Sequence, residues 1–144
     1  MGKVSIVYWS GTGNTETMAA AMAEGVKDAG AEVELLTVDK AEAAALSEAK
    51  AFALGCPAMG AEELEEGEME PFMAELDSQI AGKTIALFGS YGWGGGEWMR
   101  DWESRVVSDG AAVLSGEGII ADNAPDDDVL AECRAAGAKL AALV

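Results

Sequence analysis

The sequence predicts an α/β fold, a three-layer α/β/α sandwich with a five-stranded parallel sheet at its centre. Five apolar runs with strand character alternate with helical periods. No internal repeat or linker interrupts the alternation, and 144 residues are enough to bury a hydrophobic core. Alternating strands and helices imply right-handed connections and helices on both faces of the sheet. We therefore expect one domain over residues 1–144.

The first third of the chain contains two of the strands. An apolar run over Val4–Trp9 predicts the first strand. Methionines and a valine then recur at four-residue spacing, which predicts a helix that ends near Gly30. We expect the second strand at Glu32–Thr37 and a short helix at Ala41–Glu48.

The rest of the chain continues this alternation. Proline and glycine mark the starts and ends of its helices. We expect, in order, a strand at Ala51–Gly55, a helix at Pro71–Ile80, a strand at Thr84–Ser90, a helix at Glu97–Asp109, a strand at Ala112–Ile120 interrupted at Gly116, and a final helix after Pro125.

Composition excludes several functions. The chain has 26 acidic and 9 basic residues, a formal charge of −17, so nucleic acid would be repelled. No apolar run approaches the ~20 residues of a membrane span, and we expect a cytoplasmic protein without membrane contact. With no histidine and two cysteines, the usual metal sites cannot form, so we expect no metal. Cys56 and Cys133 are expected to be buried, reduced thiols.

The segment after the first strand suggests phosphate binding. Hydroxyl, amide and backbone N–H donors occur together at the start of a helix, whose dipole favours an anion. The segment contains no lysine, unlike the phosphate loop of nucleoside triphosphatases, and Glu16 replaces the third glycine of the dinucleotide fingerprint. The alternative is an ordinary capped turn without a ligand. The donors are Ser10, Thr12, Asn14 and Thr15, with Gly11 and Gly13 between them.

Two further loops are expected at the same edge of the sheet. If the strand order is 2-1-3-4-5, the loops after the first, third and fourth strands converge where the order reverses. Residues 59–62 supply a methionine, a glycine, an alanine and a carboxylate, and residues 91–96 supply aromatic rings among glycines. A flat conjugated ring would fit between these loops. The alternative for Trp93 is a packing anchor, and the i, i+4 spacing of Trp98 and Trp102 predicts core residues.

Three motifs together resemble the short-chain bacterial flavodoxins. They are Tyr8–Glu16, Gly55–Gly60 and Ala86–Gly94, and the likeness extends over the whole chain. The resemblance implies a flavodoxin-like fold with strand order 2-1-3-4-5 and noncovalently bound FMN. It also implies a low-potential one-electron carrier whose flavin moves between semiquinone and hydroquinone, an electron-transfer protein rather than an enzyme.

The resemblance also implies roles for individual residues. Residues 10–15 would bind the phosphate, Met59 and Trp93 would flank the ring, and Glu62 would accept a hydrogen bond from the pyrimidine N3–H. No catalytic residue is expected; the Gly60–Ala61 peptide would act as a redox switch by rotating its carbonyl toward flavin N5. The implied cofactor-binding residues are Ser10, Gly11, Thr12, Gly13, Asn14, Thr15, Ala58, Met59, Gly60, Ala61, Glu62, Ser90, Tyr91, Gly92, Trp93 and Gly94.

The sequence departs from the family pattern at two positions. Ala61 stands where a polar residue or glycine is common, and an alanine resists the positive φ that some turns require. Pro57 occupies a position that can be serine, which removes an N–H and a hydroxyl near the phosphate.

The expected partners are low-potential redox enzymes that also use ferredoxin and present basic patches to the acidic flavin edge. The acids between residues 62 and 68 should make the second reduction difficult. We expect a monomer. Two alternatives stay open: a flavodoxin-like NAD(P)H or quinone reductase, and a non-redox phosphate-binding or signalling module.

Overall fold

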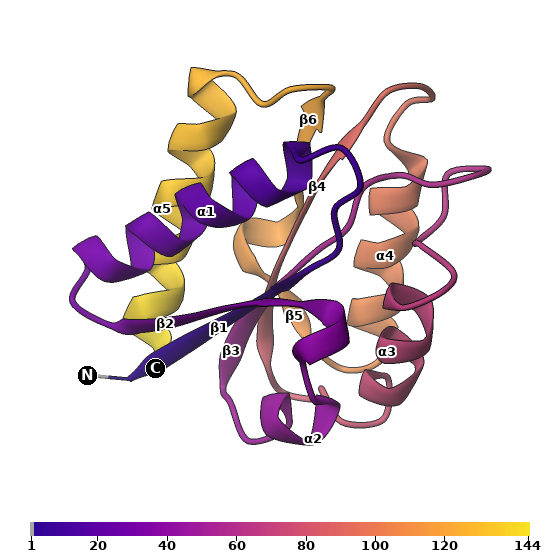
Figure 1. The fold of residues 1–144 in the computed structure, drawn as a ribbon. Helices are drawn as coiled ribbons and strands as arrows, with labels where there is room; N and C mark the ends of the chain where they lie inside the picture. Colours follow the sequence, from indigo (N-terminus) through magenta and orange to yellow (C-terminus); the bar gives the residue numbers. More distant parts are fainter. Residues whose placement is uncertain (1) are drawn as a thin grey trace.

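A parallel sheet with strand order β2-β1-β3-β4-β5 forms the centre of the computed structural model, which describes residues 2–144 (Figure 1). The predicted fold class and strand order are confirmed. A sixth strand, β6, pairs with β4 beyond the end of β5. The strands are β1 (Lys3–Tyr8), β2 (Glu32–Thr37), β3 (Ala51–Gly55), β4 (Thr84–Tyr91), β5 (Ala112–Val113) and β6 (Ile119–Asp122).

Helices cover both faces of the sheet (Figure 1). The apolar residues of α1 and α5 pack with Ile6, Ala53 and Phe88 on one face. Those of α3 and α4 pack with Leu54 and Leu87 on the other. Because successive side chains of a strand point to opposite faces, a strand between two helical layers needs apolar residues throughout. The helices are α1 (Asn14–Asp28), α2 (Ala43–Leu46), α3 (Met69–Leu76), α4 (Glu97–Ser108) and α5 (Asp127–Leu143).

The predicted fifth strand is divided in the structure. Leu114–Gly116 form a 3₁₀ turn that separates β5 from β6, and both strands pair in parallel with β4. Ser115 and Gly116 have φ values of 62° and 86°. This left-handed backbone turns the chain out of the sheet at the predicted interruption. Strand β6 continues to Asp122, two residues beyond the predicted end.

Some helix boundaries differ from the prediction. The second helix is shorter than Ala41–Glu48, and α3 begins at Met69 and ends at Leu76 rather than spanning Pro71–Ile80. Pro71 lies in the first turn of α3, where a missing N–H breaks no intrahelical hydrogen bond. Proline marked the neighbourhood of this helix start but not its first residue.

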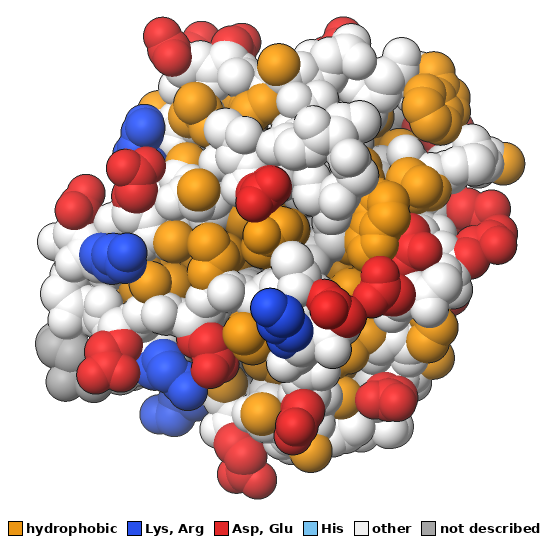
Figure 2. Space-filling model, in the orientation of Figure 1, with side chains coloured by type: hydrophobic (Ala, Val, Ile, Leu, Met, Phe, Trp, Pro, Cys, Tyr) orange, Lys and Arg blue, Asp and Glu red, His pale blue; other side chains and the backbone are white. Residues whose placement is uncertain are grey.

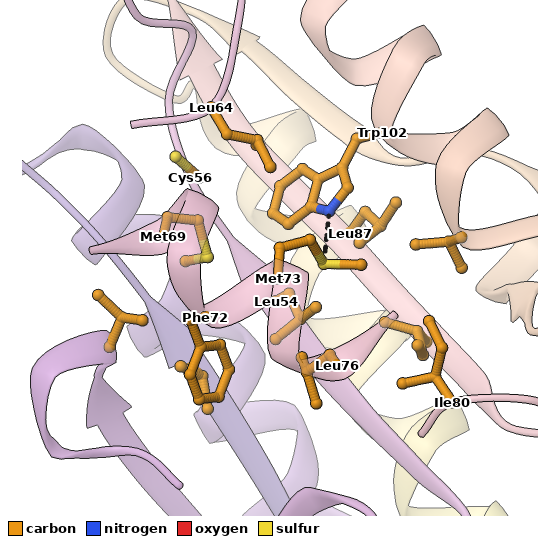
Figure 3. Packing of buried hydrophobic residues seen from close by; sticks show 14 of the residues in the cluster. Leu54, Cys56, Leu64, Met69, Phe72, Met73, Leu76, Ile80, Leu87 and Trp102 are labelled. Atoms are coloured by element: carbon orange, nitrogen blue, oxygen red, sulfur yellow. Dashed lines mark hydrogen bonds between the residues drawn. The ribbon is translucent and has the colours of Figure 1, made fainter. Parts of the chain in front are cut away.

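The predicted core residues are buried. Trp98 and Trp102 are each 1% exposed, and Figure 3 shows Trp102 on α4 donating through its indole N–H to the Met73 sulfur. Both cysteines are free thiols in the core, and burial raises the pKa of each to about 12. Within residues 2–144, no helix has the length and apolar character needed to cross a membrane.

Candidate functional site

The carboxyl ends of β1, β3 and β4 hold three loops together at one edge of the sheet. Trp9 N–H donates to the Gly55 carbonyl at 3.0 Å, which joins the first loop to the second. Ala58 N–H donates to the Ser90 carbonyl at 3.0 Å, which joins the second loop to the strand that carries the third. Parallel strands end side by side, so residues far apart in sequence meet here. The convergence that the sequence predicted is confirmed.

A cavity of ≈ 240 Å³ lies among these loops. It is lined by predicted site residues from all three loops and also by Trp9, Pro57 and Asn123. A cavity of ≈ 280 Å³ between α5 and the β5–β6 connection contains no residue of the three loops. The predicted residues that line the site cavity are Gly11, Thr12, Asn14, Ala58, Met59, Ser90, Tyr91, Gly92 and Trp93. The predicted residues of the same segments that do not line it are Ser10, Gly13, Thr15, Gly60, Ala61, Glu62 and Gly94.

Asn123 was not among the predicted site residues, although its position gives a signal. It follows β6, whose carboxyl end lies beside that of β4, and its N–H donates to the Tyr91 carbonyl at 2.7 Å. The same rule of strand ends that located the three loops applies to this residue. The sequence predicts a fifth strand that ends at Ile120, whereas β6 ends at Asp122, and these two further residues bring Asn123 to the edge of the sheet.

The first loop is wound around an oxygen atom. The Ser10 hydroxyl oxygen accepts from the backbone N–H groups of Gly13 at 3.1 Å and Glu16 at 3.4 Å. Gly13 is the N-cap of α1, has φ 95° and offers no side chain to cap the helix. The first-turn N–H groups therefore face the loop, as an oxyanion site requires.

The Thr15 hydroxyl has a different environment from the one expected. Thr15 is 1% exposed, and its hydroxyl lies 3.3 Å from the Ser90 hydroxyl. It also accepts from the Ser90 N–H at 3.4 Å. The hydroxyl predicted to bind phosphate thus joins α1 to β4, and its role as a phosphate donor stays a prediction.

The second loop contains a tight turn closed by two backbone hydrogen bonds. Met59 and Glu63 each donate an N–H to the carbonyl of the other at 2.9 Å. Within the turn, Gly60 has φ 50° and Glu62 has φ 55°. Ala61 is not among the residues with positive φ, so the strain that the sequence suggested for this alanine does not arise in this conformation.

Glu62 links the second loop to the third. Its Oε1 accepts from the backbone N–H groups of Gly96 at 3.2 Å and Glu97 at 3.1 Å, at the start of α4. A Cβ added to Gly94 would lie 2.6 Å from both Glu62 carboxylate oxygens, so glycine leaves room for this contact. The neighbouring Glu62 raises the pKa of Glu97 by hydrogen bonding and charge repulsion. No backbone N–H donates to Glu62 Oε2 within residues 2–144.

Among the aromatic residues near the site, Trp9, Tyr91 and Trp93 line the cavity, and Trp98 lies against Tyr91. The Trp98 indole N–H donates to the buried Cys56 carbonyl at 3.0 Å, and the centroids of the Trp98 and Tyr91 rings lie 5.6 Å apart. The Trp9 indole N–H donates to Glu68 at 3.2 Å. Trp93 is 54% exposed, so it is not the internal packing anchor that formed the alternative reading. Its ring is accessible to a ligand.

The surroundings of the cavity are acidic. The right side of Figure 2, which carries the 57–68 segment, shows acidic side chains and no basic ones. The five acids of this segment are Glu62, Glu63, Glu65, Glu66 and Glu68. Within residues 2–144 no group of three or more histidine, cysteine or acidic residues could hold a metal ion. Neutral donors for an anion, accessible aromatic and thioether groups and a carboxylate oxygen fit a phosphorylated flat ring with an N–H on its edge, which are the features of FMN.

Comparison with known proteins identifies the family to which the chain is similar. The flavodoxin family matches residues 6–137. A flavodoxin from Megasphaera elsdenii is 47% identical over 135 residues, which cover 92% of this chain and 98% of that protein. One from Clostridium beijerinckii is 48% identical over 124 residues, 86% of this chain and 89% of the other. The solution structure of two-electron reduced Megasphaera elsdenii flavodoxin has a TM-score of 0.85 and 45% identity, covering 96% and 99% of the two chains.

Proposed function

Because the chain belongs to the flavodoxin family of FMN-dependent electron carriers, we propose that it transfers single electrons between low-potential redox enzymes. The observation that carries the proposal is the convergence of three loops around the cavity, with neutral anion donors on one side and exposed Trp93 on the other. FMN, when bound, accepts and releases electrons one at a time.

Different residues of the chain would bind different parts of FMN. The first loop and the N-terminus of α1 would hold the phosphate through the N–H groups that now meet at Ser10 Oγ. Met59 and Trp93 would flank the ring. Glu62 has one oxygen engaged at α4 and would accept the ring N–H with the other. Pro57 contributes no N–H, so the first loop would carry more of the phosphate binding.

The Met59–Glu63 turn and the acids of residues 62–68 would influence the two reduction potentials of bound FMN. The Gly60 carbonyl would accept a hydrogen bond from the ring after a peptide rotation, for which glycine has little steric resistance. A Cβ on Gly60 would lie 3.2 Å from a Glu63 carboxylate oxygen. The acids near the cavity would oppose further negative charge and lower the second potential.

The exposed acidic side would also receive the partner. Basic patches on redox enzymes that use ferredoxin would be attracted to it, which increases the rate of encounter more than the affinity. We propose that the carrier is a cytoplasmic monomer of one domain and has no substrate of its own.

An anaerobic reductive titration of the FMN-bound protein tests the function. We expect the visible absorbance to change in two separate one-electron steps, with negligible steady oxidation of NADH in the absence of a partner enzyme. A single two-electron step together with rapid NADH oxidation would support the reductase instead. Failure of purified apoprotein to bind FMN would support the non-redox module.

A further inference from the structure

Glu65 makes more backbone hydrogen bonds than its position as one of five neighbouring acids would suggest. Its Oε1 accepts from the N–H groups of Glu68 at 2.7 Å and Met69 at 3.0 Å. Its Oε2 accepts from the Gly67 N–H at 2.7 Å. The Glu65 main-chain carbonyl also accepts from the Glu70 N–H at 2.8 Å. One residue therefore satisfies four consecutive N–H groups at the start of α3.

The geometry around this carboxylate is closely fitted. A Cβ added to Gly67 would lie 2.9 Å from Glu65 Oε2, so the chain can wrap around the carboxylate because residue 67 has no side chain. Burial alone would raise the pKa of Glu65, yet the three N–H donors hold the pKa below its ordinary value. Glu68, the N-cap of α3, makes no capping hydrogen bond with its own side chain, which leaves the capping to Glu65.

These contacts continue without a break to the turn at the cavity. Leu64 inserts into the core near Cys56 and Met69 (Figure 3). The Glu65 N–H donates to the Cys56 sulfur at 3.5 Å, and Glu63 is joined to Met59 by the two hydrogen bonds of the turn. The turn is thus fixed by β3 at its first end and by the Leu64–Glu65 segment at its second.

We propose that Glu65 is a positioning residue for electron transfer. By binding the N–H groups of residues 67–69, its carboxylate fixes the second end of the Met59–Glu63 turn. Motion within the turn would then be confined to the Gly60–Ala61 peptide, so little conformational entropy would be lost if the Gly60 carbonyl bonded to the cofactor. The inference rests on the proposed function, since it requires a cofactor at this turn.

The test compares Glu65→Gln with Glu66→Gln in the FMN-bound protein. Both variants remove one negative charge from the same segment, but Glu66 is exposed and its side chain makes no hydrogen bond within the described residues 2–144. In either orientation, the amide NH₂ introduced by Glu65→Gln would face at least one of the N–H groups that the carboxylate now accepts from. The two midpoint potentials are measured by spectroelectrochemistry.

The midpoint potential of the first one-electron step distinguishes an effect of positioning from an effect of charge. A first electron that reached bound FMN together with a proton would add no net charge, so removing a nearby negative charge should hardly change the first potential. Both variants should raise the second potential similarly, because each removes one negative charge. We expect Glu65→Gln alone to lower the equilibrium constant of the first step about tenfold, a shift of about 59 mV for one electron. Equal first potentials in the two variants would overturn the inference.

A second measurement uses the apoprotein and the pair Glu65→Ala and Glu66→Ala. We expect amide hydrogen exchange to accelerate at Gly67, Met69 and Glu63 in Glu65→Ala only, because the turn loses its fixed end. Acceleration limited to residues 67–69 would show a helix cap without a positioning role and would overturn the inference. If the unmodified protein did not show two one-electron steps, the proposed electron-carrier function itself would be wrong. This result differs from failure of the Glu65 inference, in which the unmodified protein shows both steps and the variants behave alike.

Discussion

Replacing Glu62 with alanine tests whether this carboxylate joins the second and third loops of the candidate site. The change removes the hydrogen bonds from the N–H groups of Gly96 and Glu97 to Glu62 Oε1. These bonds cap α4 from a distant loop, and loss of such a cap costs about 1 kcal/mol. We therefore expect the free energy of unfolding of the apoprotein to fall by about 1 kcal/mol, a decrease of roughly 2–4 °C in Tm for a chain of this size.

FMN affinity should fall together with stability in Glu62→Ala. The second and third loops would no longer be joined by Glu62, so the binding of FMN would have to order them. A cost of about 1 kcal/mol corresponds to a roughly fivefold increase in Kd, before any loss of the hydrogen bond proposed between the ring N–H and Glu62 Oε2. FMN is itself an anion, so removing an acid should by charge alone strengthen its binding. Positioning and charge therefore predict opposite signs for this variant.

The matched control is Glu63→Ala, since the Glu63 side chain is exposed and makes no hydrogen bond in the part of the chain that the structure describes. Urea unfolding followed by tryptophan fluorescence gives stability, and quenching of flavin fluorescence gives Kd. NMR titration should also show the pKa of Glu97 returning toward its ordinary value in Glu62→Ala only. Equal changes in stability and Kd for the two variants would refute the reasoning.

Two further substitutions test the support of the site. Trp98→Phe should lower the free energy of unfolding by about 3 kcal/mol, and the loss for Trp102→Phe should be smaller than this by about 1 kcal/mol. The reason is that the Trp98 indole donates to the buried Cys56 carbonyl, whereas the Trp102 indole donates to the Met73 sulfur. Urea unfolding measures both losses, and equal losses would contradict the explanation. Burial and the neighbouring Asp77 raise the pKa of Asp109 from 3.8 to about 6. The folded state therefore binds the proton of the Asp109 carboxyl more tightly than the unfolded state does, and the free energy of unfolding should fall as pH rises from about 4 to 6. Asp109→Asn should reduce that slope in urea unfolding at several pH values, and an unchanged slope would exclude Asp109 as its source.

The sequence predicted the sheet and the location of the site because both depend on local patterns. Apolar runs such as Ala51–Gly55 can be buried on both faces only in a covered parallel sheet, and the structure buries that strand completely. Glycines and hydroxyl residues after Val4–Trp9 predicted an anion loop at this position, and in the structure the N–H groups of Gly13 and Glu16 meet there at the Ser10 hydroxyl oxygen. The motifs were sufficient to indicate the family.

Other features depended on contacts between segments far apart in sequence. The capping of α4 by Glu62 joins residues more than thirty positions apart, as does the contact of Thr15 with Ser90. A sequence pattern lists donors and acceptors but does not determine which of them meet, because that depends on how the helices pack on the sheet. Glu65 and Glu66 look alike in the sequence, but in the structure Glu65 donates its N–H to the buried Cys56 sulfur and its carboxylate accepts from three N–H groups two to four residues ahead, whereas Glu66 is exposed. Which of two neighbouring acids is held in this way was decided only when the chain packed against the core.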